Sequence, residues 1–238
     1  TVVQLTQNME GGRRKAHPYF PDVVGQTIVV PPEPGTELPP FKVTLVSTER
    51  VEFANCVRSV ISVARIPQQP KNGEPSSSQD EVKSGDSAGT PEPAIFQHLL
   101  YSAWPDHGIP TAEDRASLLE FIRIVDDTNR DTGFAPQSAD DPDPPVIVGC
   151  SAGIGRTGSF IALSSLLRKL GVLPPPARPT PASLALPPSP LGALDGPLKD
   201  DLVAQEIDAL RDQRPGMVQR DEQILLIYEM LKAVVEGR

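Results

Sequence analysis

Residues 145–171, PVIVGCSAGIGRTGSFIALSSLLRKLG, decide the fold that we expect for this chain. The run PVIVG predicts a short β-branched strand of the kind found in the centre of a sheet. Residues 157–170 predict a largely buried helix, and Gly171 stands where a glycine commonly ends one. A strand joined to a helix by a glycine-rich turn is a building unit of a sheet covered by helices.

The rest of the chain adds strands and helices to this unit. Strands are predicted at 1–7 and, as an antiparallel pair, within 40–65, and residues 8–22 are predicted to be a loop. Residues 95–110 are predicted to be a short strand that leads into a loop. Helices are predicted at 111–127, with Thr111 as the expected N-cap, and at 202–211 and 222–235. We therefore expect an α/β fold of the α+β type, in which a mixed, largely central β-sheet is flanked by helices.

Three stretches are too polar or too rich in proline to contribute to a core, at about 67–94, 131–145 and 172–195. They carry few large apolar side chains and cannot bury enough surface to offset their chain entropy. We expect them to be low-complexity inserts in one partial domain that spans 1–238. Because the chain starts inside a predicted strand, we also expect it to be a fragment.

Composition limits the partners and the compartment. The 238 residues carry 22 Lys and Arg against 31 Asp and Glu, a formal net charge of -9. This balance argues against nucleic acid or an anionic membrane as a bulk partner, and no apolar run is long enough for a membrane span. Two cysteines, Cys56 and Cys150, are too few for a disulfide scaffold and fit a reducing compartment: the cytoplasm, with the nucleus as a second option.

The turn CSAGIGR, residues 150–156, has the chemistry of an anion cradle. Gly153 and Gly155 allow backbone conformations that residues with a Cβ resist, so successive amides can ring a tetrahedral phosphate. Arg156 adds a planar two-pronged donor, and the same dipoles favour a thiolate at Cys150. One loop therefore supplies a nucleophile, a cradle and a cation. The nucleotide P-loop is excluded, because no Gly-Lys-Ser/Thr follows.

Cys-x5-Arg-Thr in this setting resembles the signature of the cysteine-dependent protein tyrosine phosphatases. WPDHGIP (104–110) is similar to the mobile acid loop of that family, and QRPGMVQRDEQ (213–223) to the glutamine loop of its tyrosine-specific branch. LTQNMEGGRRKAHPYFP (5–21) resembles the strand and loop that open the second half of the family's domain. The resemblance covers most of 1–235 outside the inserts, and the N-terminal part of that domain has no counterpart here.

The resemblance implies a catalytic role for five residues. Cys150 would be the nucleophile, Arg156 would bind two phosphate oxygens, and Asp106 would be the general acid and then the general base. Gln219 would place the hydrolytic water, and Thr157 would donate to the Cys150 sulfur. The function implied is hydrolysis of phosphotyrosine in protein substrates through a phosphocysteine intermediate, with no cofactor and no metal.

Further residues are implied to bind substrate or to support the site. The expected substrate-binding residues are Ser151, Ala152, Gly153, Ile154, Gly155 and Arg156, together with Asp106 and Gln219. Glu10 would pair with Arg156, Lys15 would lie near the acid loop, and Gln223 would support Gln219. Trp104 and Pro105 would act as hinge and packing elements of the acid loop.

The family usually has histidine immediately before the cysteine, where this chain has Gly149. We expect this change to leave the phosphate ring intact and to raise the Cys150 pKa above the family norm. Three alternatives stay open: a pseudophosphatase that binds phosphotyrosine without turnover, a dual-specificity phosphatase, and a scaffold fragment. The last would dock PPPARPTP (174–181) into an aromatic groove as a polyproline helix, although such composition is more typical of plain linker.

Overall fold

The computed structural model describes residues 1–36, 38–67, 92–106, 108–131, 144–176, 189 and 192–237. Its strands are β1 (Val2–Gln4), β2 (Met9–Glu10), β3 (Arg13–Arg14), β4 (Thr27–Val30), β5 (Phe41–Val51), β6 (Cys56–Arg65), β7 (Ala94–Tyr101) and β8 (Ile147–Gly149). Its helices are α1 (Asp114–Arg130), α2 (Gly155–Lys169), α3 (Leu202–Gln213) and α4 (Asp221–Glu236), with 3-10 turns at Glu52–Ala54 and Gly196–Asp200.

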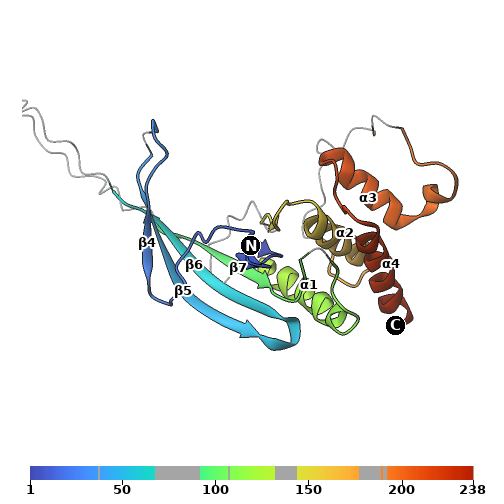
Figure 1. The fold of residues 1–238 in the computed structure, drawn as a ribbon, viewed down its shortest axis with the longest axis horizontal. Helices are drawn as coiled ribbons and strands as arrows, with labels where there is room; N and C mark the ends of the chain where they lie inside the picture. The colour runs from blue at the N-terminus through green and yellow to red at the C-terminus, as the bar shows by residue number, and fades with distance from the viewer. Residues whose placement is uncertain are drawn as a thin grey trace, which may run out of the picture.

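Six strands form one mixed sheet in the order β4-β5-β6-β7-β1-β8. β1 runs parallel to β7 on one side and to β8 on the other, whereas β4, β5, β6 and β7 pair antiparallel. The helices gather near β1 and β8, while the long strands β5 and β6 extend away from them (Figure 1). The expected mixed sheet flanked by helices is confirmed.

The strands differ from the expectation in three places. β8 lies at the edge of the sheet and not at its centre, and its Ile147 is 63% exposed. The sequence analysis missed β4, because its TIVV run is exposed throughout and shows no alternation of apolar and polar residues. Residues 8–22, expected to be a loop, contain the hairpin β2–β3, which turns at Gly11 and Gly12, both with positive φ.

The helices lie close to where the sequence predicts them. α1 begins at Asp114, three residues after the expected N-cap, yet Thr111 still accepts the backbone N–H of Asp114 at its Oγ1 (3.3 Å). α2 ends at Lys169, followed by Gly171 with φ +67°. Asp201 caps α3 by accepting the backbone N–H groups of Val203 and Ala204, as expected for a carboxylate at a helix start.

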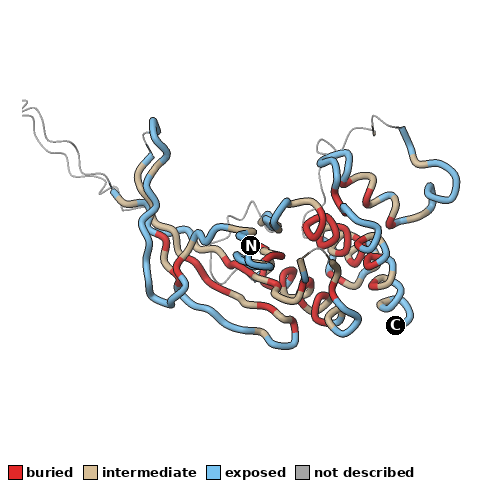
Figure 2. The backbone as a smooth tube through the Cα atoms, viewed as in Figure 1, coloured by how far each residue is buried: buried red, intermediate tan, exposed pale blue. Residues whose placement is uncertain are grey.

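The main core lies where α1, α2 and α4 meet the parallel strands. It is formed by fully buried side chains that include Leu5, Leu99, Phe121, Leu163 and Leu226. Buried residues are concentrated in the helices and in the adjoining part of the sheet, whereas β4 is exposed along its whole length (Figure 2). Among the strands, β1 and β7 therefore contribute fully buried side chains to this core, whereas β8 contributes none.

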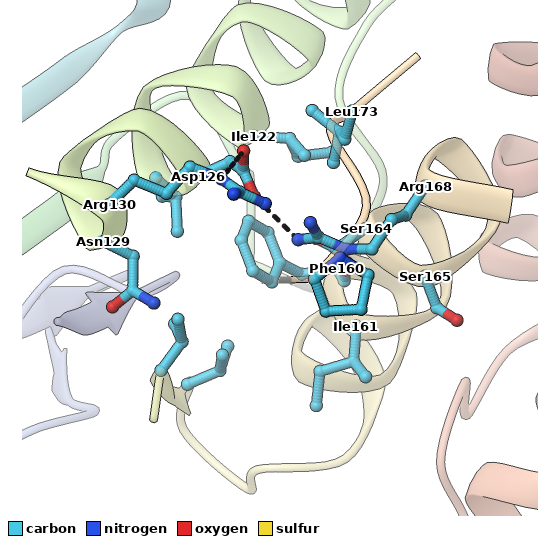
Figure 3. Close-up of a pocket in the computed structure, with 14 residues that line it drawn as sticks. Ile122, Asp126, Asn129, Arg130, Phe160, Ile161, Ser164, Ser165, Arg168 and Leu173 are labelled. Carbon is cyan, nitrogen blue, oxygen red and sulfur yellow. Dashed lines mark hydrogen bonds and ion pairs between the residues drawn. The ribbon is translucent and has the colours of Figure 1, made fainter. Parts of the chain in front are cut away.

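A cavity of about 540 Å³ lies between α1, β8 and α2. At one side of it Asp126 accepts hydrogen bonds from Arg130 (2.9 Å) and from Arg168 (2.7 Å), so the carboxylate ties α1 to α2 (Figure 3). The same two arginines donate to the carbonyl oxygen of Pro174, and Arg130 also donates to that of Pro175. The start of the proline-rich stretch is thereby attached to the helices.

The predicted inserts fall mostly outside the described residues, because 68–91, 132–143, 177–188 and 190–191 are not described. Most of PPPARPTP lies there too, and its role as a docking segment stays a prediction. Leu173, inside the third predicted insert, is buried in the main core. In the described part of the chain, no helix is both long and apolar enough to cross a membrane.

Candidate active site

Three loops meet at the carboxyl ends of β1, β7 and β8, because these three neighbouring strands are parallel. The loop after β1 carries Glu10 and Lys15, the loop after β7 carries Asp106, and the turn after β8 carries Cys150 and Arg156. Parallel neighbours end at the same edge, so segments far apart in the sequence converge there. The N–H of Leu5 donates to the carbonyl oxygen of Gly149 (2.8 Å), which ties the first loop to the third.

The turn between β8 and α2 wraps around the Cys150 sulfur. The backbone N–H of Gly153 donates to Sγ at 3.2 Å, and Gly153 has φ +70°, the left-handed region that favours glycine. α2 starts at Gly155 with no side-chain cap on its first amides. Uncapped amides at the start of a helix attract anions, so thiolate and phosphate are both favoured at this turn.

The Cys150 thiol is tuned toward its anionic form. Burial raises its pKa, but the hydroxyl of Thr157 and the amides of Thr157, Gly153 and Ile154 together bring the pKa below its ordinary value. Thr157 Oγ1 is buried and has no partner other than the sulfur among the described residues, so it is available to donate to Sγ as charge grows there. By contrast, burial raises the pKa of Cys56 to about 12.

Arg156 is fixed as a two-pronged donor. Its Nη1 and Nη2 donate to the two carboxylate oxygens of Glu10 at 2.7 and 2.8 Å, and Nη1 also donates to the carbonyl oxygen of Leu5 at 2.9 Å. Both side chains of this pair are more than nine-tenths buried. Burial raises the pKa of Glu10, but hydrogen bonds from Arg156, Thr6 and the backbone of Gln7 outweigh it and lower the pKa below its ordinary value.

Asp106 lies between two cations of the site. Its Oδ1 accepts from Arg156 Nη2 at 3.1 Å, and its Oδ2 lies 2.8 Å from Lys15 Nζ. The side chain of Asp106 is 25% exposed, so it can be reached from solvent. Trp104 is buried and donates its indole N–H to the carbonyl oxygen of Gly108 (3.0 Å), which closes the acid loop around Pro105.

The turn before α4 lies against the start of α2. The N–H of Val218 donates to the carbonyl oxygen of Ile154 (3.2 Å), and a Cβ on Gly158 would lie only 2.4 Å from that nitrogen. Gln223 is buried and contacts the position of Gly155. Gln219 itself is exposed, and its side chain makes no hydrogen bond with the described residues.

The structure thus brings Glu10, Lys15, Asp106, Cys150 and Arg156 together, with Thr157 behind the sulfur, and Gln219 follows Val218 in the turn that lies against the start of α2. It also adds contacts that the sequence analysis missed. Arg214 donates to the carbonyl oxygen of Ala152 (3.3 Å), and Arg211 donates to those of Met217 and Val218 (both 2.9 Å). Arg214 lies in the glutamine-loop motif quoted above and Arg211 lies just before it, but only the fold shows which carbonyl each one reaches.

Gly149 needs no special conformation, since nothing lies within 4 Å of the position a Cβ would take there. In the described ranges, no group of three or more His, Cys, Asp or Glu side chains is arranged to hold a metal ion. The site offers an anionic ligand the uncapped amides at the start of α2 and the cations Arg156 and Lys15.

The sequence matches the family model of the protein-tyrosine phosphatases over residues 1–172. The chain belongs to this family. Among curated proteins, the chain is similar to the rat tyrosine-protein phosphatase non-receptor type 9, at 27% identity over 238 residues, which is 99% of this chain. A Lar-like tyrosine-protein phosphatase of Caenorhabditis elegans is 33% identical over 150 residues, which is 63% of this chain and 5% of that protein.

Solved structures of tyrosine phosphatases share the fold of this chain. Those from Trypanosoma cruzi and Trypanosoma brucei superpose with TM-scores of 0.61, at 25% and 26% identity. The alignments cover 99% and 100% of this chain but 60% and 61% of the trypanosomal chains. The chain likewise spans 30% of the length of the rat protein. The family predicted from the sequence is confirmed.

Proposed function

We propose that this phosphatase hydrolyses phosphotyrosine in proteins through a phosphocysteine intermediate. The observation that carries the proposal is the position of Cys150, which lies at an uncapped helix start with a lowered pKa in the same turn as the doubly held guanidinium of Arg156. A thiolate nucleophile and a fork for phosphate oxygens in one turn suit phosphoryl transfer. The amides and Arg156 would stabilise the charge on the phosphoryl group.

The first step transfers the phosphoryl group to sulfur. The Cys150 thiolate attacks phosphorus, a P–S bond forms, and the P–O bond to the tyrosine oxygen breaks. Asp106, which enters this step protonated, gives its proton to the departing oxygen, since a phenolate is a poor leaving group without it. Arg156 holds two of the phosphoryl oxygens throughout.

The second step returns the enzyme to its starting state. Water positioned by Gln219 attacks phosphorus, the P–S bond breaks, and Asp106 takes a proton from the water. Thr157 donates to the departing sulfur, so the Cys150 thiolate and inorganic phosphate are released. Gln219 is exposed and would reach the water by turning inward from the segment that Arg211 holds.

Hydrolysis of para-nitrophenyl phosphate and of a phosphotyrosine peptide tests the proposal. We expect Cys150→Ser to abolish both activities and Asp106→Ala to lower kcat by about 10²- to 10⁴-fold, the usual contribution of a general acid. Cys56→Ser is the matched control, because this thiol is buried outside the site. Unchanged turnover in Cys150→Ser would contradict the mechanism.

A second candidate is a pseudophosphatase that binds phosphotyrosine without turnover. One observation favours it: the Asp106 carboxylate already occupies donors of Arg156 and Lys15, the groups that an incoming phosphate would need. Phosphopeptide binding by the unmodified chain, measured by fluorescence anisotropy, with no phosphate released would support this reading. Release of phosphate would exclude it.

The two free thiols also lead us to propose the cytoplasm as the protein's location.

A further inference from the structure

Arg13 faces the same space as the phosphate-binding residues. In the hairpin β2–β3, Glu10 pairs directly with Arg13, and the N–H of Lys15 donates to the carbonyl oxygen of Asn8 (2.9 Å), which continues the register. Residues directly opposite in an antiparallel pair share a face, as do alternate residues of one strand. Glu10, Arg13 and Lys15 therefore project from one face, and Arg14 projects from the other.

The contacts of its neighbours show that this face is the active-site face. Glu10 binds Arg156 and Lys15 binds Asp106, so both side chains reach into the site. Arg13 lies between them along the hairpin. It is exposed, and none of the described carboxylates forms an ion pair with it. Arg14, by contrast, contacts the His17 ring at 3.3 Å.

A second arginine, Arg214, lies beside the turn that follows Cys150. Arg214 Nη2 would be 3.2 Å from a Cβ on Gly153, and its one hydrogen bond goes to the Ala152 carbonyl. Arg214 also has no carboxylate partner within the described ranges. Two arginines that form no ion pair with the described carboxylates thus lie on the segments that build the site, Arg13 on the hairpin and Arg214 beside the turn, although the whole chain has a net charge of -9. A local charge opposite to that of the molecule is a signature of ligand selection.

We propose that Arg13 is a specificity-determining residue that selects phosphotyrosine sites with an anionic group beside the phosphorylated residue. This inference rests on the proposed function, because it concerns the substrates of the same site. The anionic group is a carboxylate of a neighbouring Glu or Asp, or a second phosphate. Arginine binds both through paired N–H donors, and phosphate offers the larger charge.

The experiment compares kcat/KM for three peptides that differ only beside the phosphotyrosine: flanked by alanine, flanked by glutamate, or next to a second phosphotyrosine. We expect the wild-type chain to prefer both anionic peptides. Arg13→Gln should reduce that preference about two- to five-fold, the size expected for one exposed ion pair. Arg14→Gln makes the same charge change on the opposite face and should keep the preference, while Arg13→Lys should restore part of it.

The outcomes separate this inference from the proposed function. Equal preference in the wild-type chain and in Arg13→Gln overturns the inference, and so does an equal loss in Arg14→Gln, which would reflect net charge alone. A response to the doubly phosphorylated peptide only identifies the selected group as phosphate. If the wild-type chain does not hydrolyse para-nitrophenyl phosphate, the proposed function fails. Anisotropy of the same peptides on Cys150→Ser then still measures selection by Arg13.

Discussion

Arg156 is a buried cation whose donors are shared among Glu10, Asp106 and the carbonyl oxygen of Leu5. Glu10 binds both prongs and is itself buried, whereas Asp106 is partly exposed and binds one prong. This difference in burial and in hydrogen bonding suits different roles for the two carboxylates. Glu10 fixes the plane of the guanidinium, and Asp106 can leave when a phosphate arrives.

Glu10→Gln tests this division of duties. Removing a charge from a buried hydrogen-bonded pair should lower the free energy of unfolding by about 1.5–3 kcal/mol. It should also lower kcat/KM for para-nitrophenyl phosphate by about 10- to 100-fold, because the fork loses its fixed orientation. Urea unfolding and steady-state kinetics measure the two effects.

Glu52→Gln is the control, because it removes the charge of Glu52 from its ion pair with Arg50. The Glu52 side chain is 75% exposed, so this pair lies at the surface. Exposed pairs contribute about 1 kcal/mol at most. A Glu10→Gln chain as stable and as active as Glu52→Gln would show that the Leu5 carbonyl and Asp106 suffice to hold Arg156.

The thiols of Cys56 and Cys150 should differ in their rates of alkylation. Iodoacetamide at neutral pH should alkylate Cys150 and spare Cys56, because the pKa of Cys150 is lowered and that of Cys56 is raised to about 12. Since the folded-state pKa of Cys150 lies below the unfolded one, its thiolate stabilises the fold above the unfolded pKa. That contribution is lost as the pH falls through the folded pKa.

The pH profile of the alkylation rate, followed by mass spectrometry, measures this pKa. We expect Thr157→Val to move the profile to higher pH, because the hydroxyl that favours the thiolate is removed. Cys150→Ser reports any labelling of Cys56. A profile centred at or above the value of free cysteine, about 8.5, would contradict the lowered pKa.

At the scale of elements, the site depends on strand order. The sequence predicted the strand, turn and helix around Cys150, because β-branched residues, glycines and apolar periodicity are local signals. It did not predict that β7, β1 and β8 are parallel neighbours, since pairing between residues 3, 99 and 148 leaves no local trace. Cys150 and Arg156 were therefore indicated by the chemistry of their turn, whereas Glu10, Lys15 and Asp106 were found only by resemblance to a family, and the fold shows where all of them meet.

Gly158→Ala should disturb the turn that carries Gln219. A Cβ on Gly158 would lie 2.4 Å from the backbone nitrogen of Val218, so α2 and this turn must separate. Overpacking of this kind costs about 1–3 kcal/mol of stability. If Gln219 places the hydrolytic water, the second step should slow more than the first, and stopped-flow traces should show a burst of para-nitrophenol.

Gly149→Ala is the matched control, because its Cβ meets open space in the same strand-to-helix unit. This variant should keep the stability of the parent chain. A Gly158→Ala chain that unfolds at the same urea concentration as Gly149→Ala would contradict the close packing of α2 against the turn.

At the scale of the whole molecule, stability should fall in acid. His98 is a buried histidine in the sheet, where it hydrogen-bonds Gln4 (3.1 Å), and burial lowers its pKa to about 4. The unfolded chain takes up a proton near pH 6.5 and the folded chain only near pH 4. Between these values the free energy of unfolding should drop by up to roughly 3 kcal/mol.

Urea unfolding at several pH values checks this expectation. His98→Gln keeps a donor for Gln4 and should flatten the dependence between pH 6.5 and 4. His17→Gln removes an exposed histidine and should leave the slope unchanged. If the slope is the same in all three chains, acid sensitivity comes from other groups.

The direction of the parallel strands also indicates where the chain should tolerate inserted residues. Residues 68–91 lead into β7 and residues 132–143 lead into β8, and both strands receive the chain at the end opposite to the cradle. Residues inserted before β7 or before β8 would therefore enter at the amino ends of these strands, away from Cys150. A reporter domain or an epitope could therefore be grafted at either place while the chemistry at the carboxyl ends stays as it is.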